Sequence, residues 1–270
     1  MKNNLVYLYN DNIKSKTKNK QERLSMTQNL FFGRNDKMMK TEKFYGSEFS
    51  QDVRLHTFNL PAIDSCPGAG ICKNFCYATQ GRYIFKTVAA PREHNFNTIK
   101  GLLKSAQTDD EAILNISNLL QENIISTFGK RINKFTNNKG QKVRNIIRIH
   151  DSGDFFHRLY FLAWCDALEK LNKTSNIQAY AYTKSVRIIQ PLMDRKPLNL
   201  HIIQSVGGLW DNEINKDLPH SKVFSNESDM LQAGYIDGSL TDIPAIEGAV
   251  KIGLIYHGTK SVSKVKKFLV

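Results

Sequence analysis

The chain has 270 residues, 41% of them hydrophobic, so it can bury a sizeable core in one large or two small domains and is not disordered throughout. Lysine and arginine outnumber aspartate and glutamate by 38 to 25, and this net charge of +13 favours a polyanionic partner, most simply nucleic acid. No apolar run approaches the length of a membrane span, and residues 1–12 lack the apolar core of a signal peptide. We therefore expect a cytoplasmic protein with no membrane contact.

The positive charge gathers in three parts of the chain. Residues 1–43 carry ten basic and four acidic side chains, and the residues after Glu247 add five lysines and no acid. A central run, residues 130–148, has seven basic residues and no acid, and its candidates for phosphate contacts are Lys130, Arg131, Lys134, Lys139, Lys142 and Arg144. Residues 211–247 have the opposite balance, eight acids and two lysines. Each run could be a solvated face, but together they indicate one shared surface for a polyanion.

In chain order, the first predicted unit is a basic arm over residues 1–45, in which residues 10–45 are rich in Asn, Lys, Thr and Gln and weakly periodic. The rest, residues 46–270, is predicted to be a single domain. Its strand-like segments are 53–60, 145–149, 178–182, 200–204, 221–224 and 251–256, and its helix-like segments are 87–106, 109–127, 156–171 and 185–196. Strands separated by helices predict an α/β fold of parallel βαβ units, either an open sheet or a partial (β/α) barrel.

Three of the four cysteines fall within eleven residues, directly after the first predicted strand. Cys66, Cys72 and Cys76 have the spacing C-x5-C-x3-C, and Pro67, Gly68 and Gly70 allow the intervening loop to fold back. Three convergent thiolates suit an iron–sulfur cluster or Zn²⁺. A zinc site would need a fourth ligand, such as His56 or His94, and ordinary buried thiols are the remaining alternative. Cys165 lies on an apolar helical stripe and is predicted to be a core residue.

Polar residues follow one predicted strand after another, and the carboxyl ends of parallel strands meet at one edge of a sheet. We therefore expect a composite site there. The predicted catalytic residues are His150, Asp151, Asp154 and Lys184, and the predicted cofactor-binding residues are Ser152, Thr183, Ser205, Gly207 and Gly208.

Each of these residues also has a structural interpretation. His150 could be a hydrogen-bonded core histidine, and Asp154 could cap the following helix. Lys184 could be solvated or could meet a phosphate or carboxylate, and Gly207 with Gly208 could form a plain turn. Residues Tyr77, Arg82 and Tyr83, beside the cysteines, are expected to shield a cluster or to stack on a base.

The blocks CPGAGICKNFCYA, IRIHDSGDF, AYAYTKS and SVGG together resemble the phage gene product 88-like family over roughly residues 50–258. A second phage family, with a cysteine cluster ending in CYA and a later TK motif, has a similar order of motifs. Both look like distant relatives of radical-SAM enzymes. That resemblance implies a partial (β/α) barrel, a [4Fe–4S] cluster on the three cysteines and S-adenosylmethionine as a further cofactor. Radical-SAM enzymes mostly use C-x3-C-x2-C, from which the present spacing departs.

Three hypotheses for function follow. The first is a phage or mobile-element iron–sulfur protein of radical-SAM-like architecture that acts on or binds nucleic acid. The second is a non-catalytic nucleic-acid-binding protein in which zinc or a cluster is structural. The third is a phage factor that binds a host protein. In each case the protein would work in the cytoplasm, that of the host cell if it is phage-encoded.

Overall fold

The centre of the molecule is a sheet built from the short β-branched and aromatic segments of the sequence. The computed structural model describes residues 29–256, and its eight strands lie in the order β1-β2-β3-β4-β5-β6-β8-β7. The strands are β1 (Phe32–Gly33), β2 (Asp52–Phe58), β3 (Val143–Ile149), β4 (Ile177–Thr183), β5 (Leu200–Ser205), β6 (His220–Phe224), β7 (Ile236–Asp237) and β8 (Lys251–Ile255). Only the pairing of β1 with β2 is antiparallel among these strands. The predicted α/β class with parallel strands is confirmed.

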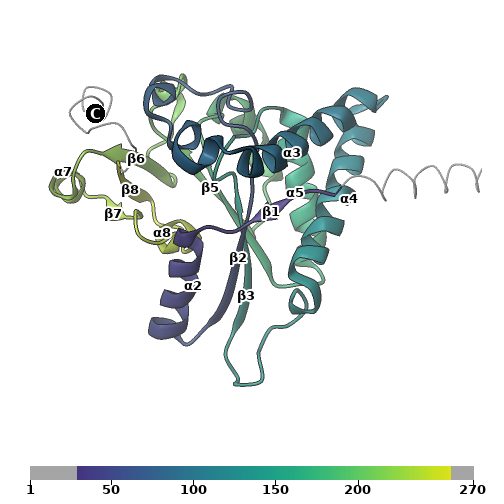
Figure 1. Ribbon diagram of the computed structural model, residues 1–270, viewed down its shortest axis with the longest axis horizontal. Helices are drawn as coiled ribbons and strands as arrows, with labels where there is room; N and C mark the ends of the chain where they lie inside the picture. Colours follow the sequence, from purple (N-terminus) through teal and green to yellow (C-terminus); the bar gives the residue numbers. More distant parts are fainter. Residues whose placement is uncertain (1–28, 257–270) are drawn as a thin grey trace, which may run out of the picture.

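Helices connect most of the strands (Figure 1). They are α2 (Asp36–Phe49), α3 (Lys86–Ser105), α4 (Asp109–Phe128), α5 (Arg158–Asn172), α6 (Val186–Ile189), α7 (Glu227–Gln232) and α8 (Ile243–Ile246). The start of α4 is well specified, because the Thr108 side chain accepts from the Glu111 amide and three acids occupy the first turn. The single helix predicted over 185–196 is divided into α6 and the 3₁₀ segment Gln190–Arg195, which contains Pro191 near its start. Proline cannot donate the backbone hydrogen bond that would continue α6.

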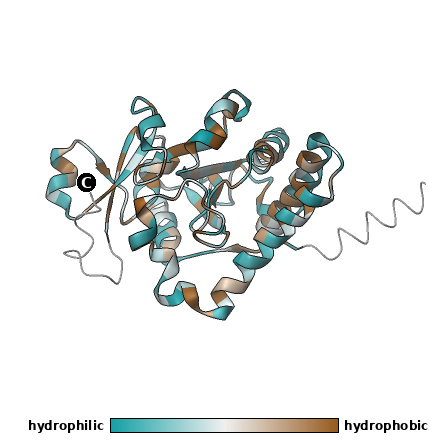
Figure 2. Cartoon of the chain, turned by 90° about the horizontal axis from the view of Figure 1, so that it is seen from above, coloured by the Kyte–Doolittle hydropathy of each residue, from teal (hydrophilic) through white to brown (hydrophobic). Residues whose placement is uncertain are grey.

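Side chains alternate across the strands, so the sheet has a hydrophobic core on each face. Helices α4 and α5 cover one face, where Trp164 packs edge-on against Phe58 of β2 at 5.4 Å between ring centroids. Cys165 is 3% exposed in this core, which confirms its predicted structural role. Helices α2 and α8 cover the other face, where Tyr45 and Tyr180 are buried. Figure 2 shows hydrophobic and hydrophilic residues on the same helices, as this layered packing requires.

The second core includes part of the predicted basic arm. Met38, Thr41 and Tyr45 of α2 are buried, and Lys37 forms an ion pair with Asp242 at 2.8 Å. The boundary predicted at residue 45 therefore falls inside a packed helix. The sequence did not predict helix α2, because only three of its positions are buried and their neighbours are charged and polar. Residues 1–28 of the predicted arm lie outside the described residues. Within residues 29–256, no helix is long and apolar enough to cross a membrane.

Candidate cysteine-lined site

The cysteine loop, residues 61–85, leaves the carboxyl end of β2 and packs onto the ends of β4 and β5. It contains the 3₁₀ turns Ile71–Phe75, Tyr77–Thr79 and Gly81–Ile84. Two backbone hydrogen bonds hold it to the turn after β5, from the Cys72 amide to the Gly207 carbonyl at 3.2 Å and from the Leu209 amide to the Gly68 carbonyl at 2.9 Å. The loop is therefore fixed by backbone contacts to strands that are far away in the sequence.

Two glycines make this close approach possible. A Cβ atom on Gly68 would lie 2.0 Å from the carbonyl oxygen of Lys184, and one on Gly70 would lie 2.6 Å from the carbonyl carbon of Gly208. Both distances are to backbone atoms, which cannot move aside as a flexible side chain can. The glycines in the CPGAGIC block are thus required for packing of the loop against the sheet.

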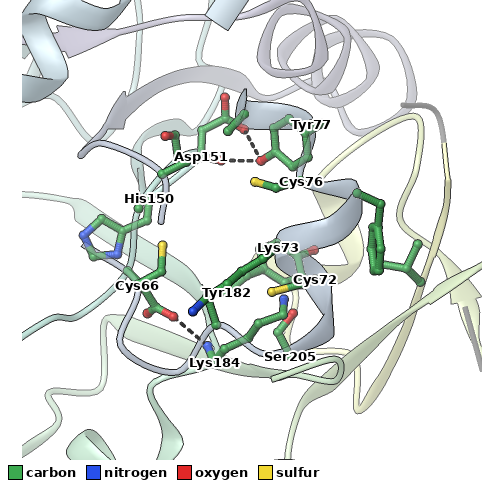
Figure 3. A pocket seen from close by; sticks show the side chains of 18 of the residues that line it. Cys66, Cys72, Lys73, Cys76, Tyr77, His150, Asp151, Tyr182, Lys184 and Ser205 are labelled. Carbon is green, nitrogen blue, oxygen red and sulfur yellow. Dashed lines mark hydrogen bonds between the residues drawn. The ribbon is translucent and has the colours of Figure 1, made fainter. Parts of the chain in front are cut away.

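The three cysteines of the loop line a single cavity of about 200 Å³, at the carboxyl ends of the strands (Figure 3). Each of the neighbouring strands adds a side chain to its wall: Arg148 from β3, Tyr182 from β4, Ser205 from β5, Val223 from β6 and Leu254 from β8. The predicted convergence of the cysteines with the ends of the strands is therefore present. Within residues 29–256, however, no three His, Cys, Asp or Glu side chains come close enough to surround one metal ion.

The environment of Cys66 and Cys76 favours the protonated form of these two thiols. Burial, followed by the nearby Asp154 carboxylate, raises the pKa of Cys66 to about 12. Burial also raises the pKa of Cys76, against which the charge of Lys184 acts in the opposite direction. A thiolate in this cavity therefore needs additional positive charge beside it, as a metal centre provides.

Two lysines also line the cavity. Lys184 comes from the end of β4, and Lys73 lies between Cys72 and Cys76 in the loop. Neither ammonium group has a carboxylate within ion-pair distance in the described part of the chain. This placement favours the interpretation of Lys184 as a group that meets an anion. Lys73 was not among the predicted site residues, although its position inside the cysteine block was a signal for it.

Asp151 is the centre of a hydrogen-bonded network that ties the cysteine loop to the sheet. Its carboxylate accepts a hydrogen bond from Tyr83 and pairs with Arg148 of β3 at 3.2 Å. The Tyr77 hydroxyl donates to the backbone carbonyl of Asp151 and lies 3.3 Å from the carboxylate. Asn35, which caps α2, donates its side-chain amide to the same carboxylate at 3.1 Å. The side chain thus joins the loop, α2 and β3, a positioning role rather than the catalytic one predicted.

Asp154 fixes the end of β4. Its buried carboxylate accepts hydrogen bonds from the Thr183 hydroxyl at 2.6 Å and the Lys184 amide at 2.8 Å, while burial raises its pKa. The predicted alternative, that Asp154 caps α5, is wrong, because the cap is His157, whose Nδ1 accepts from the Leu159 amide. Thr183 also stabilises the end of β4, because its hydroxyl accepts a hydrogen bond from the Ser185 amide at 3.0 Å.

The ring of His150 lies in the core. It packs edge-on against Phe155 at 4.8 Å between ring centroids, and Nε2 contacts the Tyr160 hydroxyl at 2.8 Å. Burial lowers its pKa to about 3, which leaves the imidazole neutral at neutral pH. The placement fits the core-histidine interpretation rather than proton transfer in the cavity.

The remaining predicted cofactor contacts are engaged within the protein. Ser152 donates its hydroxyl to the Leu60 carbonyl at 2.7 Å, and Ser205 contacts Ser221 at 3.0 Å, although both line the cavity. The amides of Gly207 and Gly208 both donate to the Asp211 carboxylate, each at 2.8 Å to its nearer oxygen. The two glycines form a closed turn, so their amides are occupied.

Neither histidine considered as a fourth ligand belongs to the cavity wall. His56 packs against Phe128 on the α4 side of the sheet, and burial lowers its pKa to about 4. His94 contacts the Asn29 carbonyl at 2.8 Å. The expected completion of a zinc site by one of them is therefore wrong.

Most of the central basic run lies at the opposite edge of the sheet, in the connection from α4 to β3 and the start of β3 (Figure 1), whereas its last member, Arg148, lines the cavity. Arg131 pairs with Asp52 at 2.8 Å, and Arg144 is buried and pairs with Glu247 at 2.6 Å. These two arginines were predicted to contact phosphates, but their charges are already balanced within the fold. The other predicted residues, Lys130, Lys134, Lys139 and Lys142, are all exposed.

Comparison with known proteins supplies the family. The family model described as "Gene product 88" matches residues 28–262, which is most of the chain. The chain belongs to the gene product 88 family. Neither a curated protein nor a solved structure shows a significant match to it.

Proposed function

We propose that this gene product 88 family member is an iron–sulfur protein that binds or acts on nucleic acid. Cys66, Cys72 and Cys76 would hold the cluster. The observation that carries the proposal is that one loop places three thiols around a single cavity at the carboxyl ends of parallel strands, where α/β proteins bind ligands.

Among the described residues the thiols are not gathered around one point as a zinc ion requires, and the proposal of a multi-iron cluster rests on their number and their common cavity. A zinc site draws its sulfur ligands to about 2.3 Å from one ion, whereas the three thiols are spread around the wall of the cavity. A [4Fe–4S] cluster distributes its cysteine ligands over several metal atoms. A cluster also supplies the positive charge that the buried thiols need in order to ionise.

The order of the strands supports a partial (β/α) barrel. From β2 to β6 each parallel strand lies beside the one before it, without the central reversal of order found in doubly wound sheets, and the order changes only at the end, where β8 lies between β6 and β7. In a barrel the inward face narrows toward a common centre. The wall residues Arg148, Tyr182 and Ser205 all belong to the face that would point inward, which is also the face on which α2 and α8 pack.

When bound, the cluster supplies one-electron chemistry. The residues of the chain would provide binding and orientation. Lys73 and Lys184 would attract an anionic group of the substrate into the cavity, and Asp154 would hold the Lys184 backbone in place. Asp151 would keep the cysteine loop closed against β3 through Tyr77 and Tyr83.

Purification without oxygen tests the cluster. We expect a brown protein that contains iron and acid-labile sulfide, and a Cys72→Ser variant that loses both. The matched control is Cys165→Ala, which removes a thiol from the α5 core and should retain the metal. A colourless protein with one zinc and no iron would overturn the proposal in favour of a structural metal site. Cleavage of S-adenosylmethionine by the reduced protein would extend the proposal to radical chemistry.

A net charge of +13 supports nucleic acid as the partner. Titration with an oligonucleotide at several salt concentrations tests it, because phosphate contacts release counterions and make affinity fall steeply with salt. Binding that is absent or independent of salt would contradict this part of the proposal and would favour a protein partner.

A further inference from the structure

An exposed segment of mixed aromatic, aliphatic and basic residues ends the cysteine loop. In Arg82–Lys86, Ile84 is 65% exposed and Phe85 is 58% exposed, and both Arg82 and Lys86 are exposed. Large apolar side chains on a surface usually indicate contact with a partner when they cluster. The segment does not belong to the wall of the cavity described above.

The backbone that carries these side chains is held in place. Tyr83 points inward, where its hydroxyl donates to Asp151 and the guanidinium of Arg92 lies 4.4 Å from the centre of its ring. The Phe85 amide donates to the Arg82 carbonyl at 3.2 Å, which closes the 3₁₀ turn Gly81–Ile84. The exposed side chains therefore extend from a fixed support, and binding would order little additional backbone.

The loop that carries the segment is basic, and the nearby Asp151 carboxylate is already paired with Arg148. Residues 65–92, which lie between Asp64 and Glu93, contain four basic residues and no acid, whereas all three arginines of the central basic run are paired with carboxylates of the fold. Four aromatic residues are interleaved with the four basic ones, namely Phe75, Tyr77, Tyr83 and Phe85. Basic side chains next to an exposed ring are complementary to a phosphate backbone with unstacked bases.

The segment is also continuous with the cavity. The rings of Tyr77 and Tyr83 are 5.4 Å apart and nearly perpendicular, and Tyr77 lines the cavity. A nucleic acid that contacts Phe85 would thus be separated from the cysteines and from Lys73 by the rings of Tyr77 and Tyr83.

We infer that Arg82–Lys86 is the binding surface for single-stranded nucleic acid. A base stacks on Phe85 beside Ile84, and Arg82 and Lys86 contact the flanking phosphates. A duplex hides the faces of its bases, so the exposed ring selects a single strand. This inference rests on nucleic acid being the partner in the proposed function, and it moves the binding surface from the predicted central run to the cysteine end of the sheet.

Fluorescence anisotropy with a labelled unstructured single strand, as DNA and as RNA, and with a duplex of the same sequence tests the inference. We expect Phe85→Ala to weaken binding of the single strand about tenfold, since stacking on one aromatic ring is worth about that factor. Arg82→Ala with Lys86→Ala should weaken it further and reduce its dependence on salt. The matched control is Lys130→Ala with Lys134→Ala, which removes two exposed lysines at the opposite edge and should leave affinity unchanged.

The outcomes separate this inference from the proposed function. If the control variant loses binding and the Phe85 variant retains it, the surface is wrong while nucleic acid stays the partner. Tighter binding of the duplex than of the single strand also overturns the inference. If the wild type binds none of the probes at low salt, both the surface and the nucleic-acid partner are wrong, whereas the iron content remains a separate test of the cluster.

Discussion

Among single residues, Asp151 has the most connections near the cysteines. Its carboxylate, 8% exposed, is the shared acceptor for Tyr83 and Asn35 and the ion-pair partner of Arg148, while its backbone carbonyl accepts from the Tyr77 hydroxyl. Asp242 pairs with the other nitrogen of the same guanidinium at 3.3 Å and also contacts Tyr180 at 2.8 Å. The buried arginine is thus balanced by two carboxylates, one on each terminal nitrogen, and Asp151 also holds the loop.

We predict that Asp151→Ala lowers the free energy of unfolding by about 3 kcal/mol, because it removes one partner of a buried ion pair and the acceptor of the Tyr83 hydroxyl and the Asn35 amide. Urea denaturation followed by circular dichroism measures this. Asp64→Ala, an exposed acid in the same loop, serves as the control and should change stability by less than about 0.5 kcal/mol. Equal effects of the two substitutions would contradict the role assigned to Asp151.

His150 gives a prediction about pH. Burial lowers its pKa from 6.5 to about 3, so the unfolded chain takes up a proton at this residue before the folded chain does. Its neutral form stabilises the fold fully above pH 6.5, and this contribution is lost as the pH falls toward 3, with a slope of up to about 1.4 kcal/mol per pH unit.

A His150→Asn variant should therefore show a flatter loss of unfolding free energy between pH 7 and pH 4 than the wild type. Asparagine tolerates the left-handed backbone at this position, where φ is 69°. His56, whose pKa is also lowered, remains in both proteins, so the difference between the two curves isolates His150. Parallel curves would show that the imidazole is not buried in its neutral form.

The same residue shows how far the sequence can predict the site. Strand alternation would direct residue 150 toward the same face as Arg148, and hence toward the cavity. The left-handed backbone at His150 turns its ring into the other core, against Phe155 and Tyr160. The sequence predicts that Asp151, Asp154 and Lys184 gather at one edge, because that follows from strand order, but not where each side chain points after the strand ends.

At the level of elements, the strands and long helices of the main domain were predictable because their hydrophobic periodicity is strong. Predicted strand 145–149 corresponds to Val143–Ile149, and predicted helix 109–127 corresponds to Asp109–Phe128. Elements with few buried positions were not predicted. Helices α7 and α8 are short, and β1 and β7 contain two residues each, so none of them has a recognisable period.

The packing of the cysteine loop onto β4 and β5 depends on Gly68. We predict that Gly68→Ala destabilises the fold by about 2 kcal/mol and lowers the iron content, because its Cβ would overlap the Lys184 carbonyl and move the loop that carries the cysteines. Thermal unfolding and metal analysis of the purified variant measure the two effects.

Gly101→Ala is the matched control for this substitution. Gly101 lies in the interior of α3, and a Cβ there meets nothing within 4 Å. Alanine is the better helix former by about 1 kcal/mol, so this variant should be slightly more stable than the wild type with an unchanged iron content. Equal tolerance of both substitutions would mean that the loop does not pack as described.

For the molecule as a whole, the two edges of the sheet carry different properties. The carboxyl edge holds the cysteines, the two lysines of the cavity and the exposed Arg82–Lys86 segment. The opposite edge holds the central basic run apart from Arg148, and there Arg131 and Arg144 bind Asp52 and Glu247 and thereby close the fold around β2 and β3. The net charge of +13 counts all basic side chains equally, but only the basic side chains without an internal partner are free to contact a polyanion.

This separation predicts a local response to loss of the metal. A bound cluster would join three points of the cysteine loop, so its removal by a chelator should speed amide hydrogen exchange in residues 61–86 and leave residues 129–142 unchanged. Hydrogen exchange followed by mass spectrometry resolves the two regions. The Cys72→Ser variant should already exchange rapidly in the loop and should not respond to the chelator. Faster exchange at both edges would instead mean that the metal stabilises the entire sheet, and unchanged exchange in the loop would place the metal elsewhere.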